Sequence, residues 1–265
     1  MNDWTSEDGL RWRALAPFGI EIDCDLSEPL TAERTAKLAA LLAKGGYLLA
    51  RGQTLSMEQQ TALMEPIGPI IRRPQENGYI STDVAAPSSR SELSFHADAA
   101  YTNAPFAAIS LHAVDVVDGA SGTRFVNAEH AYATLPPKLR KRLDATVAEM
   151  ISPMLEGVGV RACDTRDPEA THRQEFPAIR VNPRTGRPCV GVSEMHTARL
   201  TGMDWEQSRA LLAEIYDHLY ADENAIEHRW RRGDIVLWDN LTLQHARGSL
   251  EGAGRRVLQR VVAGA

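Results

Sequence analysis

Short apolar runs separated by turn-forming residues fill the last third of the chain, and they constrain the fold most. Each run has the length of a buried strand, and the turn-forming segment 182–186 follows the first of them. Longer or earlier runs at 47–50 and 107–114 have the same character. These patterns predict an α+β fold, a β-sandwich or barrel with helices packed outside. The four late runs are residues 178–181, 189–192, 235–238 and 257–262.

Helices are expected where apolar residues recur every three or four positions. The first covers residues 31–44 and stops at Gly45-Gly46. Ser56 and Gln59 have the spacing of a capping box at the start of a second helix. Two more are predicted: one opened by Pro136-Pro137 with Leu139, Leu143 and Val147 as its stripe, and one over residues 205–220.

Composition limits the class of protein and its partners. With 265 residues and neither repeats nor a Pro/Gly/Ser linker, we expect one domain over residues 1–265. The net charge of -6 disfavours nucleic acid and anionic membranes, and no apolar run is long enough to span a bilayer. The three scattered cysteines and the lack of a signal-peptide pattern predict a cytoplasmic protein.

A His-x-Asp pattern, His96-Ala97-Asp98, is the first candidate metal site. In a strand, residues two apart point to the same face, so His96 and Asp98 can hold one ion from one side. The pattern alone is weak, since a hydrogen-bonded His–Asp pair has the same spacing. His245 lies beyond the run at 235–238, where a loop could aim it back into a barrel.

Two histidines and one carboxylate make the facial triad of non-haem iron(II) oxygenases. Zinc accepts the same ligands and is the alternative metal, although a zinc hydrolase has no support from an H-E-x-x-H pattern. Arg256 and Arg260 lie on one side of the last predicted strand. They form either a solvated basic face or a cavity wall that binds a carboxylate through guanidinium groups.

These motifs, in this order, resemble the taurine dioxygenase and 2,4-dichlorophenoxyacetate dioxygenase (TauD/TfdA) family of iron(II)/2-oxoglutarate enzymes. The resemblance covers most of the chain. The matching segments are residues 19–22, 46–53, 96–98, 122–125, 182–187, 238–240 and 245–260.

The resemblance implies a distorted double-stranded β-helix (jelly roll) with helices outside. It implies Fe(II) ligation by His96, Asp98 and His245, with 2-oxoglutarate and O2 as cosubstrates. Thr123 and Arg256 match the residues that hold the distal carboxylate of 2-oxoglutarate, and Arg260 matches a second arginine nearer its metal-bound end. Because Asp98 is intact, halogenation is disfavoured. A homo-oligomer is compatible with the family.

The implied activity is hydroxylation of an unactivated C–H bond in a small organic substrate, with release of succinate and carbon dioxide. An acidic substrate is one option. Desaturation or cyclisation on the same scaffold is an alternative, and so is a non-catalytic jelly-roll protein that binds a metal or ligand.

Substrate residues are expected around the mouth of the barrel. Arg72 could bind a substrate acid or belong to a solvated basic pair. Tyr101 and His196 occupy positions that line the substrate pocket in the family, and His196 could equally be a surface histidine. Residues 71–83 are a lid candidate, with Pro74 and Gly78 as breakers.

Overall fold

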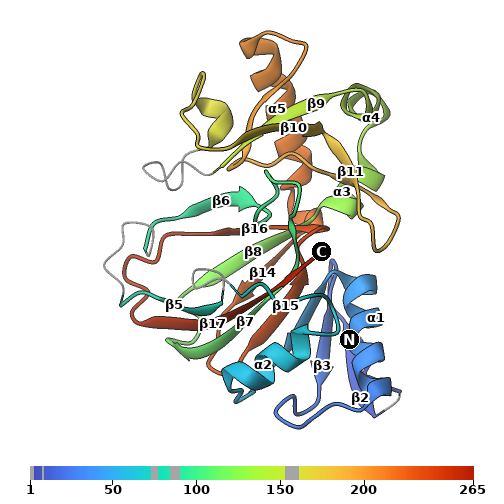
Figure 1. The fold of residues 1–265 in the computed structure, drawn as a ribbon, viewed down its shortest axis with the longest axis vertical. Coiled ribbons are helices and arrows are strands. Elements are labelled where there is room, and N and C mark those ends of the chain that lie inside the picture. Colours follow the sequence, from blue (N-terminus) through green and yellow to red (C-terminus); the bar gives the residue numbers. More distant parts are fainter. Residues whose placement is uncertain (1–2, 8, 73–76, 84–89, 153–160) are drawn as a thin grey trace.

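The computed structural model describes residues 3–7, 9–72, 77–83, 90–152 and 161–265. Two β-sheets form its centre and helices lie outside them (Figure 1). In spatial order, the larger sheet contains β1 (Thr5–Glu7), β2 (Leu10–Ala14), β3 (Ile20–Asp23), β4 (Tyr47–Ala50), β15 (Ile235–Asp239), β7 (Phe106–Val116), β17 (Arg256–Gly264) and β5 (Gly78–Ser81). The smaller sheet contains β14 (Ala225–Arg229), β8 (Gly122–Asn127), β16 (Leu243–Arg247) and β6 (Leu93–His96).

The two sheets share one apolar core. Side chains of β15 alternate, so that Val236 and Trp238 belong to this shared core while Ile235 and Leu237 belong to the core on the outer face. From the smaller sheet, Phe125 contributes to the shared core and is fully buried. The sheets therefore pack face to face, with the predicted strands at their centre.

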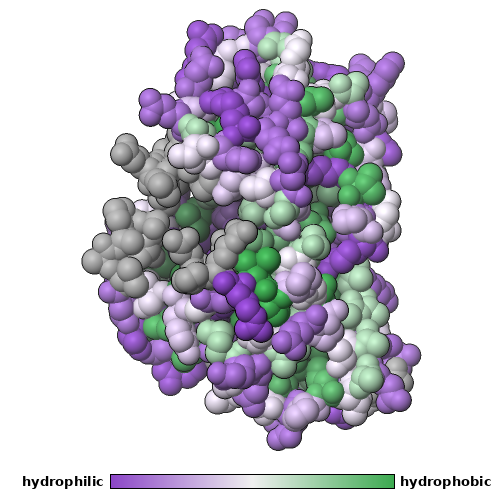
Figure 2. Space-filling model, in the orientation of Figure 1, coloured by the Kyte–Doolittle hydropathy of each residue, from purple (hydrophilic) through white to green (hydrophobic). Residues whose placement is uncertain are grey.

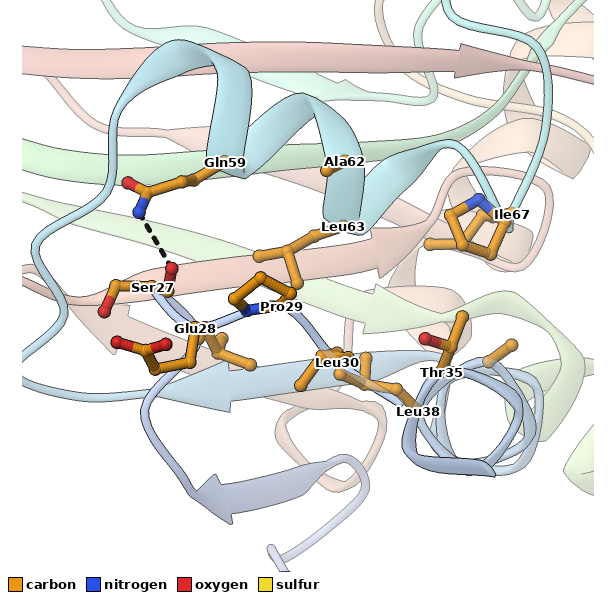
Figure 3. Close-up of a pocket in the computed structure, with 13 residues that line it drawn as sticks. Ser27, Glu28, Pro29, Leu30, Thr35, Leu38, Gln59, Ala62, Leu63 and Ile67 are labelled. Carbon is orange, nitrogen blue, oxygen red and sulfur yellow. Dashed lines mark hydrogen bonds between the residues drawn. The ribbon is translucent and has the colours of Figure 1, made fainter. Parts of the chain in front are cut away.

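The outer face of the larger sheet is covered by α1 (Ala32–Gly45) and α2 (Met57–Met64). Both helices begin where the sequence predicts. The capping box of Ser56 and Gln59 is present, and Gly46 ends α1 in the left-handed conformation with φ 70°. Between these helices and the segment 26–30 lies an apolar cavity of about 250 Å³ (Figure 3). Glu28 is the one charged side chain among its described lining residues, so this cavity lacks metal-binding chemistry.

The outer face of the smaller sheet packs against a mixed unit, seen at the top of Figure 1. Its helices are α3 (Ala128–Thr134), α4 (Pro137–Asp144), α5 (Trp205–Leu219) and the short 3-10 turns η2 (Ala162–Asp164) and η3 (Asp222–Asn224). Its strands are β9 (Val147–Ile151), β10 (Arg173–Pro177), β11 (Ile179–Val181), β12 (Pro188–Val190) and β13 (Thr197–Leu200).

One helix prediction is wrong at its end. Leu139 and Leu143 are buried on α4 as expected, but Val147 begins β9 instead of extending the helical stripe. The Thr146 hydroxyl donates to the Arg142 carbonyl and its amide donates to the Leu143 carbonyl, which closes the last helical turn. The chain beyond that turn pairs with β10 and β13.

The surface is mostly polar. Figure 2 shows hydrophilic residues over much of one face, with hydrophobic residues in separate patches. Among the helices of the described ranges, none combines the length and apolar character needed to cross a bilayer.

Candidate metal centre and cosubstrate pocket

Three side chains from separate elements converge between the two sheets. His96 ends β6, Asp98 follows two residues later, and His245 lies in β16 directly opposite His96. One ligand atom from each residue lies within 4.8 Å of the others. Two histidines and one carboxylate are the ligand set of a facial triad.

The local geometry differs from the sequence prediction in two ways. Asp98 is not in the strand with His96 but in a turn, where the next residue, Ala99, has φ 57°. His245 is not in a loop but in a strand, so its position is fixed by the pairing of β16 with β6 and β8. The Asp98 carboxylate still reaches His96, with 3.3 Å between Oδ1 and Nε2.

The protonation states suit a divalent metal. His96 Nδ1 lies 2.8 Å from the Ser94 carbonyl, so a proton on Nδ1 leaves Nε2 as the ligand atom. Burial, together with the nearby His96, lowers the pKa of His245 to about 3, which keeps its imidazole neutral. The Nδ1 atom of His245 is buried and has no hydrogen-bond partner among the described residues.

Arg260 controls the charge of Asp98. Burial alone would raise the pKa of the Asp98 carboxyl, but the Arg260 guanidinium and the two histidines lower it well below its ordinary value. Arg260 Nη2 donates to Asp98 Oδ2 at 2.7 Å. Asp98 is thus ionised and ready to bind a cation.

A second cationic group is Arg256, whose side chain is buried at the start of β17. Burial, with the repulsion of nearby Arg247, lowers the Arg256 pKa to about 9. Arg256 makes no ion pair with a described residue, and its Nε is buried without a partner. Trp230 lies beside it, 5.9 Å from ring centre to guanidinium, and donates from Nε1 to the Thr123 hydroxyl at 3.0 Å. The Thr123 hydroxyl proton therefore stays available to a carboxylate.

Of the predicted substrate residues, the structure brings two near the cluster. His196 is buried, with its ring 5.9 Å from that of His96, and Tyr101 lies 4.9 Å from His196. Arg72 is exposed just after Ile71, whose amide donates to the Val262 carbonyl.

The lid candidate is only partly described, because residues 73–76, which include Pro74, lie outside the described ranges. Where it is described, residues 78–81 form β5 and pair with β17, so this part is an edge strand of the larger sheet rather than a free lid.

Two residues of the site had no role assigned from sequence. Asn240 accepts from the Asp98 amide at 3.0 Å and donates to the Asp98 carbonyl at 2.9 Å. Trp230 lies beside Arg256 and donates a hydrogen bond to Thr123. The only sequence signal for Asn240 is the Trp238-Asp239-Asn240 motif of the family resemblance.

Known proteins resemble this chain in sequence and in fold. The family model "Taurine catabolism dioxygenase TauD, TfdA family" matches residues 11–262. The chain is 28% identical to an alpha-ketoglutarate-dependent 2,4-dichlorophenoxyacetate dioxygenase of Cupriavidus pinatubonensis, over 91% of this chain and 92% of that protein. It is 24% identical to an alpha-ketoglutarate-dependent sulfate ester dioxygenase of Pseudomonas putida, over 94% of this chain and 91% of that protein.

The fold also has a solved counterpart. The crystal structure of a taurine dioxygenase from Burkholderia xenovorans superposes with a TM-score of 0.81 over 97% of this chain and 91% of that chain, at 22% identity. This likeness shows a shared mixed fold, rich in sheet with few helices. With the family model matching nearly the whole chain, the resemblance drawn from the motifs is confirmed: the chain belongs to the TauD/TfdA family and is a dioxygenase that uses Fe(II), 2-oxoglutarate and O2.

Proposed function

We propose that His96, Asp98 and His245 bind the catalytic Fe(II) and that the enzyme hydroxylates an unactivated C–H bond of a small organic substrate, releasing succinate and carbon dioxide. The observation that carries this proposal is the convergence of two imidazoles and one ionised carboxylate within 4.8 Å. Iron(II) favours this mixed nitrogen and oxygen ligand set, and three protein ligands leave coordination positions for cosubstrate and oxygen.

Arg256 and Thr123 bind the distal carboxylate of 2-oxoglutarate in this proposal. The support is a buried guanidinium without a described counter-ion beside a hydroxyl that can still donate. Burying such a charge is costly until an anion pairs with it. Arg260, already bonded to Asp98, gives the metal-bound end of the cosubstrate a cationic neighbour.

These contacts indicate which roles belong to the protein and which to the bound metal and cosubstrate. Bound iron and 2-oxoglutarate supply the oxidising chemistry, and the protein supplies orientation and electrostatics. Ser94 fixes the tautomer of His96, Asn240 holds the main chain of Asp98, and Arg260 keeps its carboxylate ionised. Tyr101 and His196 form a wall beside the metal ligands where the substrate would lie.

We also propose that the two facing sheets are the halves of a distorted double-stranded β-helix, and that residues 1–265 form one domain. The support is the single apolar core shared by β4, β7, β15 and β17 of one sheet and β8 and β16 of the other.

The metal assignment is tested by anaerobic addition of Fe(II) and 2-oxoglutarate, whose chelate gives a weak visible charge-transfer band. We expect the band in the unaltered protein and in a His130→Ala control, since His130 is exposed on α3. We expect no band in His245→Ala. A folded His245→Ala protein that keeps the band would overturn the assignment.

The cosubstrate assignment is tested with adjacent arginines. Arg256→Met should weaken 2-oxoglutarate binding by about 10- to 100-fold, because a charge-assisted hydrogen bond contributes about 1.5–3 kcal/mol. Arg255→Met is the matched control, since Arg255 is exposed and pairs with Asp83 and Asp115. Calorimetric titration of 2-oxoglutarate in the presence of a divalent metal measures both. Equal affinities in the two variants would rule out the role of Arg256.

A further inference from the structure

The loop between β11 and β12, residues 182–187, reaches the end of β15 through an ion pair. Arg184 Nη2 lies 2.6 Å from Oδ2 of Asp239, the last residue of β15. The Asp239 side chain is 1% exposed, and among the described residues Arg184 is the one cation that pairs with it. Burying a carboxylate is costly unless a cation compensates its charge. The Asp239 carboxylate therefore holds the hairpin loop at the end of β15.

The same guanidinium nitrogen also contacts β7, the neighbour of β15 in the larger sheet. Arg184 Nη2 donates to the Ala107 carbonyl at 3.3 Å. This carbonyl also accepts from the main-chain amide of Asn240 at 3.0 Å. The other oxygen of the Asp239 carboxylate accepts from the Leu241 amide at 2.8 Å. The two groups that Arg184 contacts therefore also bind the main chain at Asn240 and immediately after it.

Asn240 connects this point to the metal site. It is buried, its side-chain oxygen accepts from the Asp98 amide at 3.0 Å, and its side-chain nitrogen donates to the Asp98 carbonyl at 2.9 Å. A continuous chain of contacts thus leads from the hairpin loop to the turn of Asp98, with Asn240 as its last member. Contacts outside the ligand set of a metal site determine how its ligands are aimed.

The hairpin loop itself is folded so that Arg184 points to this place. Asn182 accepts from the Arg184 amide at 2.9 Å through its side-chain oxygen. Its side-chain nitrogen donates to the Thr242 hydroxyl at 2.7 Å and lies 3.3 Å from Asp239 Oδ2. Gly186, with φ 69°, donates its amide to the Asn182 carbonyl and closes the loop. The loop is therefore attached to the segment around Asp239 by more than one bond.

We propose that Arg184 is a positioning residue of the metal centre and acts on Asp98 through Asn240. Without the ion pair, fewer bonds hold the end of β15, so Asn240 fixes the turn of Asp98 less firmly. The Asp98 carboxylate then meets the metal in a wider range of positions, and metal affinity falls. This inference rests on the proposed role of Asp98 as a metal ligand.

The test compares two arginines of one loop. Each pairs with a buried carboxylate, Arg184 with Asp239 and Arg187 with Glu129 at 2.7 Å. We expect Arg184→Met to lower Mn(II) affinity by about tenfold, the lower end of the range for loss of an outer contact, and Arg187→Met to leave it unchanged. Titration of the full chain with Mn(II), followed by the electron paramagnetic resonance of the free ion, measures both. Equal losses in the two variants would overturn the proposal.

A double-mutant cycle with Asn240 separates positioning from general destabilisation. If Arg184 acts through Asn240, Arg184→Met should cost little further Mn(II) affinity in an Asn240→Ala protein, so the two losses are not additive. A purely structural effect of Arg184 would lower the affinity by the same factor in both backgrounds. Additive losses would therefore overturn the proposal.

A milder variant guards against loss of folding. Asp239→Asn keeps the shape of the side chain and an oxygen that can accept from the Leu241 amide, but it removes the charge that Arg184 binds. We expect this variant also to bind Mn(II) more weakly. Arg184→Lys, which keeps the charge without the planar fork, should recover part of the affinity lost in Arg184→Met. Unchanged affinity in folded Arg184→Met or in Asp239→Asn would overturn the proposal.

Measuring His245→Ala in the same titration separates this inference from the metal assignment. If His245→Ala binds Mn(II) as tightly as the unaltered protein does, the metal assignment fails and this inference fails with it. If His245→Ala loses Mn(II) while Arg184→Met keeps it, the metal assignment stands and only the role of Arg184 is wrong.

Discussion

Asn240 organises the metal site without being one of its ligands. Its amide group bonds to both the N–H and the carbonyl of Asp98 and also to the Phe106 carbonyl at 3.0 Å. These bonds hold a turn whose backbone includes the uncommon positive φ of Ala99. Such outer contacts determine how well a metal ligand is aimed.

We predict that Asn240→Ala lowers Fe(II) or Mn(II) affinity by about 10- to 100-fold, the usual range for loss of an outer partner. Asn103→Ala is the control, because Asn103 follows the same turn but bonds to Gln174 instead. Metal titration of both folded variants gives the comparison. If Asn240→Ala bound metal as tightly as the control, Asn240 would not position Asp98.

Residue types and spacing were enough to propose the metal ligands, but not to place them. His96, Asp98 and His245 were proposed because their side chains are the ligand types of a facial triad. Arg256 was proposed because it lies on the same side of the predicted strand as Arg260. Thr123 needed the family resemblance, since a threonine after a glycine turn has no chemistry of its own.

Helix ends were predictable where a side chain caps the backbone locally. The capping box of α2 and the glycine stop of α1 are formed within a few residues of the chain. The end of α4 was missed because Leu139, Leu143 and Val147 keep a helical spacing across a boundary. That boundary depends on β9 pairing with β10 and β13, which are distant in sequence.

We predict that Ser56→Ala destabilises the protein by about 1 kcal/mol, because it removes the hydroxyl that caps the Gln59 amide of α2. Ser56→Asp should retain most of the stability, since a carboxylate can cap the same amide. Urea unfolding of the two variants and the unaltered protein measures the difference. Equal losses in both would show that the cap contributes nothing.

At the scale of the whole molecule, a buried polar chain joins the two sheets. The hydroxyl of Tyr47 in β4 lies 3.0 Å from Nδ1 of His228 in β14. On the other side of the ring, His228 Nε2 lies 3.2 Å from Asp234 Oδ2. Arg51 binds both oxygens of Asp234 at 3.0 Å. Contacts of this kind join residues far apart in the chain, so they could not be predicted from the sequence. The strand that contains Tyr47 and the strand at residues 235–238 could be predicted.

This polar chain predicts a loss of stability in acid. Burial lowers the pKa of His228 below its ordinary value of 6.5. Below that pH the unfolded chain binds a proton that the folded protein does not, so stability falls as the pH falls. We expect His228→Gln to be less stable at neutral pH but to lose less stability between about pH 7 and pH 5, the range in which histidines titrate.

Urea unfolding at both pH values measures this effect, with His130→Gln as the exposed control. The same acid-induced loss in His228→Gln as in the control would exclude His228 as its source.

The register of one strand pair has a consequence for how the enzyme matures. His245 lies directly opposite His96, and a slip of a single residue between β16 and β6 would turn the later imidazole to the other face. With iron bound as proposed, only correctly aligned chains can take up the ion. With iron in excess, iron occupancy would equal the fraction of molecules in which this alignment succeeded. Scarce iron would leave aligned chains without the stabilisation that a tightly bound ligand provides.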